Sequence, residues 1–240
     1  MLDYYFITGT SSGLGYALTK QLTNIKNNFV IGFARHLEFE RSNYSHKHID
    51  LSSVVNVLNY DFPNINNAKS ITLINNAAVL GEIDYLGNLS DDRLASTLLV
   101  NLVAPTILCN KFMRKYKTIE LPKTIINIGS GASKSPYDGW GAYCASKAGL
   151  EMLSDIIHKE QEIVNTGFRI HNIAPGVVDT KMQDDIRNTS QNKFSRMDKF
   201  VALKEENKLY SPDDVAMEII RIIQDPSAID TVSHRIELIK

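Results

Sequence analysis

The chain has 240 residues, of which 43% are apolar and 22% charged, and its 26 Lys and Arg nearly balance its 27 Asp and Glu. These proportions are typical of one globular domain spanning residues 1–240, and they argue against a disordered or collagen-like chain and against a broad nucleic-acid surface. No apolar run reaches membrane-spanning length, and two cysteines without a recognisable signal peptide favour a cytoplasmic location with no membrane partner.

Short apolar runs alternate with longer helical patterns along most of the chain. The expected strands are residues 4–8, 28–34, 45–49, 71–75, 124–128 and 169–173. The expected helices are residues 14–26, 52–60, 91–117 and 141–164, and a last one that begins after Ser211 and ends at Ile223. This alternation predicts an α/β fold, a single-domain Rossmann-type doubly wound parallel sheet of about seven strands with helices on both faces. The least regular segment, 179–209, is long for a connection, and we expect it to form a lid over the substrate.

A glycine-rich segment, residues 9–15, follows the first strand and opens the first helix. Glycines at such a turn let the backbone approach a pyrophosphate at the positive end of the helix. The spacing is G-x-x-x-G-x-G, which differs from the common dinucleotide fingerprint, and a merely flexible turn is the alternative. The cofactor contacts expected here are Gly9, Ser11, Ser12, Gly13, Leu14 and Gly15.

Arg35 ends the second strand, twenty positions after Gly15, and no acid precedes Glu38. In dinucleotide-binding folds an acid in this region binds the adenosine ribose, whereas an arginine suits a 2′-phosphate. The sequence therefore predicts NADP(H) over NAD(H), unless Arg35 is only an exposed residue at a strand end.

Further motifs follow in order along the whole chain, and together they resemble the short-chain dehydrogenases/reductases. They include the Asn75-Asn76-Ala77-Ala78 segment, where Ala78 replaces the usual glycine, and Tyr143-x-x-x-Lys147 with Ser130 thirteen residues earlier. The resemblance implies a catalytic set of Asn101, Ser130, Tyr143 and Lys147. It also implies further cofactor contacts at Asp50, Leu51, Asn76, Ala77, Tyr143, Lys147, Pro175, Gly176, Val178 and Thr180.

Tyr143 and Lys147 are four residues apart, which places them on one helix face. A nearby ammonium lowers the pKa of a phenol, so we expect Tyr143 to exchange a proton with the substrate oxygen. The resemblance also implies that Lys147 binds the nicotinamide ribose, that Ser130 polarises the substrate carbonyl, and that Asn101 holds a water linking Lys147 to solvent. A surface pair beside a core serine is the alternative interpretation.

Within the family, the chain resembles the branch that contains sepiapterin reductases and benzil reductases. Apolar residues before Tyr143 and within 179–209 favour a small hydrophobic carbonyl substrate. The leading hypothesis is reduction of an α-dicarbonyl such as benzil to (S)-benzoin. A pterin ketone anchored by Asp179, a 3-oxoacyl thioester, and a non-catalytic NADP-sensing protein are the alternatives.

Self-association and metal binding have weaker signals. The resemblance implies a homodimer or homotetramer, and apolar residues such as Leu150, Leu153 and Ile157 suit either a partner or the chain's own core. His46 and His48 alternate on an expected strand, but no zinc-type spacing appears, and we predict no metal site.

Overall fold

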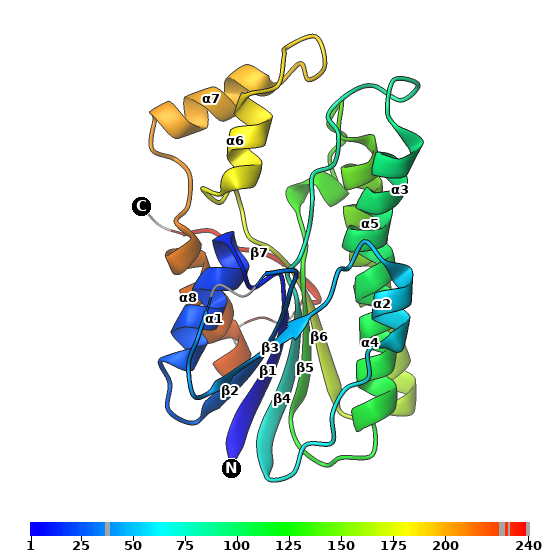
Figure 1. Cartoon of the computed structure of the whole chain (residues 1–240), viewed down its shortest axis with the longest axis vertical. Coiled ribbons are helices and arrows are strands. Elements are labelled where there is room, and N and C mark those ends of the chain that lie inside the picture. The colour runs from blue at the N-terminus through cyan, green and yellow to red at the C-terminus, as the bar shows by residue number, and fades with distance from the viewer. Residues whose placement is uncertain (37–38, 226–228, 230, 239–240) are drawn as a thin grey trace.

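The computed structural model describes residues 1–36, 39–225, 229 and 231–238. Its described part contains a seven-stranded, entirely parallel sheet with the order β3-β2-β1-β4-β5-β6-β7 (Figure 1). The strands are β1 (Leu2–Thr8), β2 (Asn28–Ala34), β3 (Tyr44–His48), β4 (Ala68–Asn75), β5 (Lys123–Ile128), β6 (Phe168–Ala174) and β7 (Ser233–Arg235). The predicted doubly wound α/β fold is confirmed.

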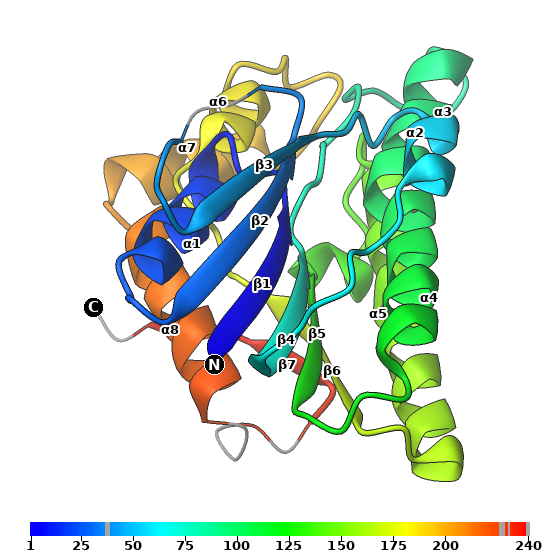
Figure 2. The ribbon, with the colours of Figure 1, turned by 60° about the horizontal axis from the view of Figure 1, so that its bottom comes forward.

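Helices cover both faces of the sheet, as Figure 2 shows. One face carries α1 (Gly13–Thr23) and α8 (Pro212–Gln224), and the other carries α2 (Val54–Asn59), α4 (Ala104–Tyr116) and α5 (Gly141–Val164). Each face has its own apolar core, which contains Leu18 and Ile219 on the first side and Phe6 and Phe112 on the second. Because helices bury both faces, the central strands are apolar runs rather than alternating patterns.

The expected helix over 91–117 is interrupted. It consists of α3 (Asp91–Leu98), a π-helical turn at Leu99–Val103, and α4. Pro105 has no N–H to donate to the carbonyl of Asn101 four residues earlier, so the regular hydrogen-bond ladder cannot continue there. The sequence pattern predicted a helix over these residues, but it did not predict the π turn that carries Asn101.

The stretch Asp91–Tyr116 is long and apolar enough to cross a bilayer by length and composition alone. Core helices of soluble proteins pass the same test. Here Leu108, Phe112 and Tyr116 are buried against the sheet, so the apolar character of this helix serves the core.

Two parts of the chain differ from the expectation. The segment 179–209 is not irregular, because it contains α6 (Lys181–Arg187) and α7 (Met197–Glu205), which lie beyond the carboxyl ends of the strands (Figure 1). The strand β7 contains no apolar run that could predict it, because its three residues Ser-His-Arg are polar. It joins the sheet by pairing with β6.

Candidate active site

A groove of about 790 Å³ runs along the carboxyl edge of the sheet. Loops after successive parallel strands meet at this edge, which is where α/β folds bind ligands. All but two of the residues predicted for the site line it: Gly9, Ser11, Ser12, Gly13, Leu14, Arg35, Asp50, Leu51, Asn76, Ala77, Ser130, Tyr143, Lys147, Pro175, Gly176, Val178 and Thr180. The exceptions are Gly15 and Asn101, which lie behind the groove wall.

Gly15 has a packing role that its place in the motif did not reveal. A Cβ at this position would collide with the carbonyl oxygen of Gly9 and with the amide of Asn76. Asn76 Nδ2 donates to the carbonyl oxygens of Thr8 (2.9 Å) and Gly9 (3.3 Å), and Thr8 Oγ1 accepts from the backbone N–H of Asn76 at 2.9 Å. The glycine loop is therefore fixed by hydrogen bonds between the ends of β1 and β4.

A second brace holds the loop from the side of β3. Tyr44 Oη and Thr10 Oγ1 lie 3.1 Å apart and share a hydrogen bond. The ring of Tyr44 lies across Gly32 on β2, where any Cβ would collide with it. Gly32 thus makes room for a tyrosine that ties the glycine loop to the sheet.

The residues after β2 and β3 form the outer end of the groove. Asp50 accepts hydrogen bonds from Ser52 N (2.9 Å) and Ser52 Oγ (2.7 Å), which lower its pKa, and nearby Arg35 adds to that effect. Within the described ranges Arg35 forms no ion pair, and Glu38 lies outside those ranges. The Arg35 guanidinium therefore lines the groove near Asp50 and forms no ion pair with a carboxylate in the described part of the chain.

Tyr143 and Lys147 project from α5 into the inner end of the groove, and both are buried. Lys147 Nζ donates to the carbonyl oxygen of Ile128 at 2.7 Å and lies 5.8 Å from the centre of the Tyr143 ring. Burial lowers the pKa of Lys147 to about 8. Burial also raises the pKa of Tyr143, and a hydrogen bond with Ser130 offsets this only in part. The predicted lowering of the Tyr143 pKa by Lys147 is therefore wrong for the unliganded site, because desolvation outweighs it.

Asn101, on the π turn, supports the site from behind. Its Oδ1 accepts from Val79 N (2.9 Å), and its Nδ2 donates to Val79 O (2.8 Å) and to Ser146 Oγ (3.2 Å). Ser146 Oγ in turn donates to the carbonyl oxygen of Tyr143 at 2.7 Å. These bonds connect the loop after β4 to α5, and the water-holding role of Asn101 stays a prediction.

Aromatic rings form the wall beside Tyr143. Trp140 stacks on Tyr137 (centroids 4.8 Å apart) and on Phe194 (4.9 Å), and it meets the Tyr143 ring edge-on at 5.8 Å. Phe194 and Phe200 belong to the segment 179–209, and both are buried in this cluster. Part of the predicted pocket wall therefore packs the segment onto the core, while Tyr137, Trp140 and Phe200 line the groove.

Polar contacts join the segment 179–209 to the loops that follow β4 and β5. Lys193 Nζ lies 2.8 Å from the carboxylate of Asp84, and this contact is the main reason that the pKa of Asp84 is lowered to about 2. Asp138 accepts from Ser195 N (2.7 Å) and Ser195 Oγ (2.9 Å). A Cβ on Gly139 would collide with the Lys193 carbonyl oxygen, so glycine allows this close approach.

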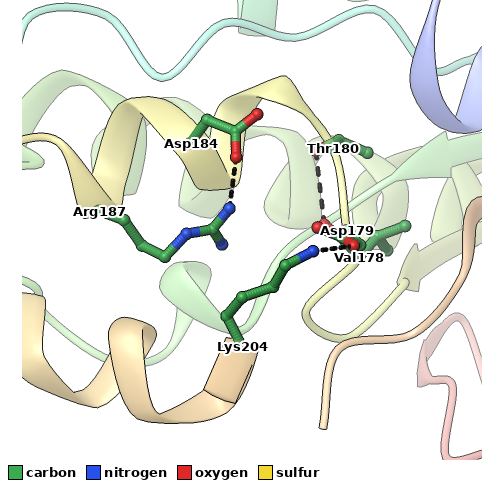
Figure 3. Close-up of polar contacts among 6 residues, drawn as sticks. All are labelled: Val178, Asp179, Thr180, Asp184, Arg187 and Lys204. Atoms are coloured by element: carbon green, nitrogen blue, oxygen red, sulfur yellow. Dashed lines mark hydrogen bonds and ion pairs between the residues drawn. The ribbon is translucent and has the colours of Figure 1, made fainter. Parts of the chain in front are cut away.

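Asp179, proposed above as an anchor for a pterin, does not line the groove. Its carboxylate lies 2.6 Å from Lys204 Nζ on α7, and Arg187 pairs with Asp184 one turn along α6 (Figure 3). The first pair joins α7 to the turn before α6, and the second lies within α6.

The polar residues that line the groove without a role assigned from the sequence include Arg93, Gln183 and Arg235. Of these three, only Gln183 had a local signal, since it stands in a Thr-x-x-Gln pattern at a helix start. Among the described residues, no group of three or more His, Cys, Asp or Glu side chains is placed to hold a metal ion.

Residues 4–191 match the family model of the short chain dehydrogenases. The chain belongs to this family. It is therefore an oxidoreductase that acts on carbonyl or alcohol groups with a nicotinamide cofactor, as members of this family do. The short chain dehydrogenase fold is also seen in a solved relative, the KRED1-Pglu enzyme, with a TM-score of 0.79, 25% identity, and coverage of 98% of this chain and 100% of that chain.

Two curated relatives of this short-chain dehydrogenase are informative. It is 39% identical to a benzil reductase ((S)-benzoin forming) of Bacillus cereus, with coverage of 93% of this chain and 94% of the relative. It is 32% identical to a sepiapterin reductase of Mus musculus, with coverage of 68% of this chain and 62% of that relative. The branch to which the sequence motifs pointed is thereby confirmed.

Proposed function

We propose that this chain is an NADPH-dependent carbonyl reductase that converts an α-dicarbonyl such as benzil to (S)-benzoin. The observation that carries the proposal is the position of buried Tyr143, which lines the groove together with Ser130 and lies beside the aromatic wall. The similarity to a benzil reductase over nearly the whole length of both chains supports the same substrate class.

The groove fits a nicotinamide dinucleotide. Gly9 and Gly13 have positive φ angles of 75° and 53°, which turn the loop at the start of α1, where a pyrophosphate is favoured. Asp50 and Leu51 would contact the adenine end, and Arg35, which forms no ion pair within the described ranges, supports a 2′-phosphate and hence NADPH. When bound, this cofactor supplies the hydride for the reaction.

The protein's contribution is to orient the carbonyl and to supply a proton. Ser130 and Tyr143 would both hydrogen-bond the substrate oxygen, and Tyr143 would give it a proton as the new alcohol forms. A reductase needs this acid protonated at the start, which the raised pKa of Tyr143 provides at neutral pH. Lys147, with a pKa near 8, is suited to restoring the proton afterwards.

The shape of the wall favours aryl-substituted dicarbonyls over the alternatives. Tyr137, Trp140 and Phe200 give flat apolar surfaces for aromatic rings. The pterin hypothesis loses its proposed anchor, since Asp179 pairs with Lys204 outside the groove. A purely NADP-sensing role would not require the complete set of Asn101, Ser130, Tyr143 and Lys147.

A substrate panel that follows NADPH absorbance tests this proposal. It should contain benzil, 1-phenyl-1,2-propanedione, sepiapterin and an acetoacetyl thioester, with chiral analysis of the products. We expect the highest kcat/KM for the two aryl diketones and (S)-benzoin from benzil. Turnover of the thioester or of sepiapterin alone would contradict the substrate assignment.

We further propose a cytoplasmic homodimer or homotetramer. The residues named from the sequence, Leu150 and Ile157, are buried in the chain's own core, whereas Met152 and Ile156 on the same helix are exposed. An exposed apolar stripe on a long helix supports association with a second copy. Light scattering during size exclusion should give a multiple of the 26.9 kDa chain mass.

A further inference from the structure

Gln183 on α6 is a buried polar side chain without a hydrogen-bond partner. The residue is only 7% exposed and lines the groove. Its amide oxygen is buried and unpaired, and its amide nitrogen forms no hydrogen bond within the described part of the chain. Buried amides are nearly always paired, so an unpaired one in a ligand groove indicates a partner that binds there.

The obvious local role for Gln183 is not used. Thr180 caps α6, and Thr-x-x-Gln is the pattern of a capping box, in which the glutamine amide would accept from the Thr180 N–H. No such bond forms, and only the backbone N–H of Gln183 contacts this turn, donating to Thr180 O at 2.8 Å. The Thr180 hydroxyl donates instead to Val178 O at 3.4 Å, as Figure 3 shows.

The neighbouring charges are largely occupied with one another. Asp179 pairs with Lys204, and Asp184 pairs with Nη2 of Arg187 (Figure 3). Nη1 of Arg187 is buried and unpaired, and it lies one turn along the helix from Gln183. Arg187 does not line the groove, and its unpaired nitrogen makes it a competing partner that an experiment must separate from a ligand.

We propose that the amide of Gln183 binds a second oxygen of the substrate, on the carbon next to the carbonyl that is reduced. This inference rests on the proposed function, and it defines the substrate class as carbonyl compounds with an adjacent hydrogen-bond acceptor. Ser130 and Tyr143 hold the reacting oxygen, and Met182, Ile186 and Phe200 make the nearby wall apolar. Rotation of the terminal amide exchanges the positions of its oxygen and nitrogen, so that Gln183 presents its N–H to the second oxygen of a dicarbonyl. A monoketone would leave that amide unpaired, and such sites discriminate strongly against the analogue that lacks the acceptor.

The experiment compares benzil with deoxybenzoin, which has the same two rings but a single carbonyl group. Gln183→Met keeps the length of the side chain and removes the amide. We expect kcat/KM for benzil to fall about 10- to 100-fold, the effect of losing one buried hydrogen bond. The value for deoxybenzoin should change less than about threefold, and the dissociation constant for NADPH, measured by fluorescence, should not change. Gln183→Leu provides a second variant, and NADPH binding shows that each variant is folded.

Several outcomes would overturn the inference. Equal losses for both compounds would make Gln183 a structural residue of α6, and weakened NADPH binding would make it a cofactor ligand. Arg187→Met is the matched control: the same selective loss in that variant would assign the effect to Arg187. If the unaltered enzyme reduces neither compound, the proposed function itself fails. If it reduces benzil and Gln183→Met shows no selective loss, only the inference fails.

Discussion

The two walls of the groove are held in place by different kinds of contact. On the cofactor side, Thr8, Asn76 and Gly15 fix the glycine loop through short hydrogen bonds and close backbone packing between β1, β4 and α1. On the other side, the segment with α6 and α7 packs through buried Phe194 and Phe200, and ion pairs join Lys193 to Asp84 outside the segment and Lys204 to Asp179 within it. Exposed ion pairs contribute little stability and weaken with salt, so we expect the second wall to loosen more readily than the first.

This difference separates the expected effects of substitutions. Changes on the cofactor-side wall should alter cofactor binding and leave substrate recognition intact. Changes on the α6–α7 wall should alter substrate turnover and leave cofactor binding intact. Tyr143 on α5, which lies between the walls, should affect mainly the chemical step.

The largest effect is expected for Tyr143→Phe. Removal of the phenol hydroxyl takes away the proton donor, so turnover should fall about 1,000-fold while NADPH binding stays within about twofold. Steady-state kinetics and fluorescence titration measure the two quantities. Tyr137→Phe, the same change on the neighbouring aromatic wall, is the control and should keep most of the activity. Retained turnover in Tyr143→Phe would exclude the proposed mechanism.

Arg35→Asp should give the next largest effect. A carboxylate in place of the guanidinium would repel a 2′-phosphate, so KM for NADPH should rise about 10- to 100-fold and KM for NADH should not rise. Arg41→Asp, which changes a nearby arginine that stacks on Phe39, is the control for net charge. An unchanged preference between the two cofactors would show that Arg35 does not select NADPH.

Lys193→Ala should have a smaller effect, confined to the substrate. Loss of the contact with Asp84 loosens the α6–α7 wall, so KM for the carbonyl substrate should rise about three- to tenfold, with NADPH binding unchanged. High salt should reproduce part of the effect in the unaltered enzyme. Lys199→Ala removes an exposed lysine on α7 and should change neither constant. A change in NADPH binding in Lys193→Ala would contradict the prediction that this wall affects the substrate and not the cofactor.

The smallest expected effect is on stability as a function of pH. The folded pKa of Lys147 is about 8, below its ordinary value of 10.5, so the unfolded chain binds more protons between these values. Stability of the cofactor-free protein should therefore increase as pH rises from about 8 to 10.5, because unfolding takes up a proton and a higher pH disfavours that uptake. Thermal unfolding of the wild type and Lys147→Met should show a steeper rise for the wild type. Parallel curves would mean that Lys147 is not the group responsible.

The sequence predicted the cofactor-side wall far better than the opposite one. Strand, glycine loop and helix N-terminus are local patterns, and Gly9, Gly13, Arg35, Asp50 and Tyr143 line the groove. The ion pairs of Lys193 with Asp84 and of Lys204 with Asp179 join residues far apart in the sequence. No local or periodic pattern in the sequence predicts such pairs. For the same reason the segment 179–209 seemed irregular, although α6 and α7 form on it.

Other features escaped prediction because their physical cause is tertiary. The π turn at Asn101 follows from Pro105 within a helix that remains apolar on one face, and β7 forms through pairing with β6 alone. The pKa of Tyr143 depends on burial, which the i,i+4 spacing to Lys147 does not report. Gln183 fits a capping pattern in the sequence, and only the folded chain shows that its amide is left free for the groove.

The central claim is that this groove transfers hydride from NADPH to one carbonyl of an aryl diketone while Tyr143 supplies the proton. The most direct test is a single reaction of the unaltered enzyme with benzil and NADPH carrying deuterium at the transferable C4 position, analysed by chiral chromatography and mass spectrometry. We predict (S)-benzoin with one deuterium on the carbinol carbon. Absence of NADPH oxidation, benzoin without deuterium, or a racemic product would contradict the claim.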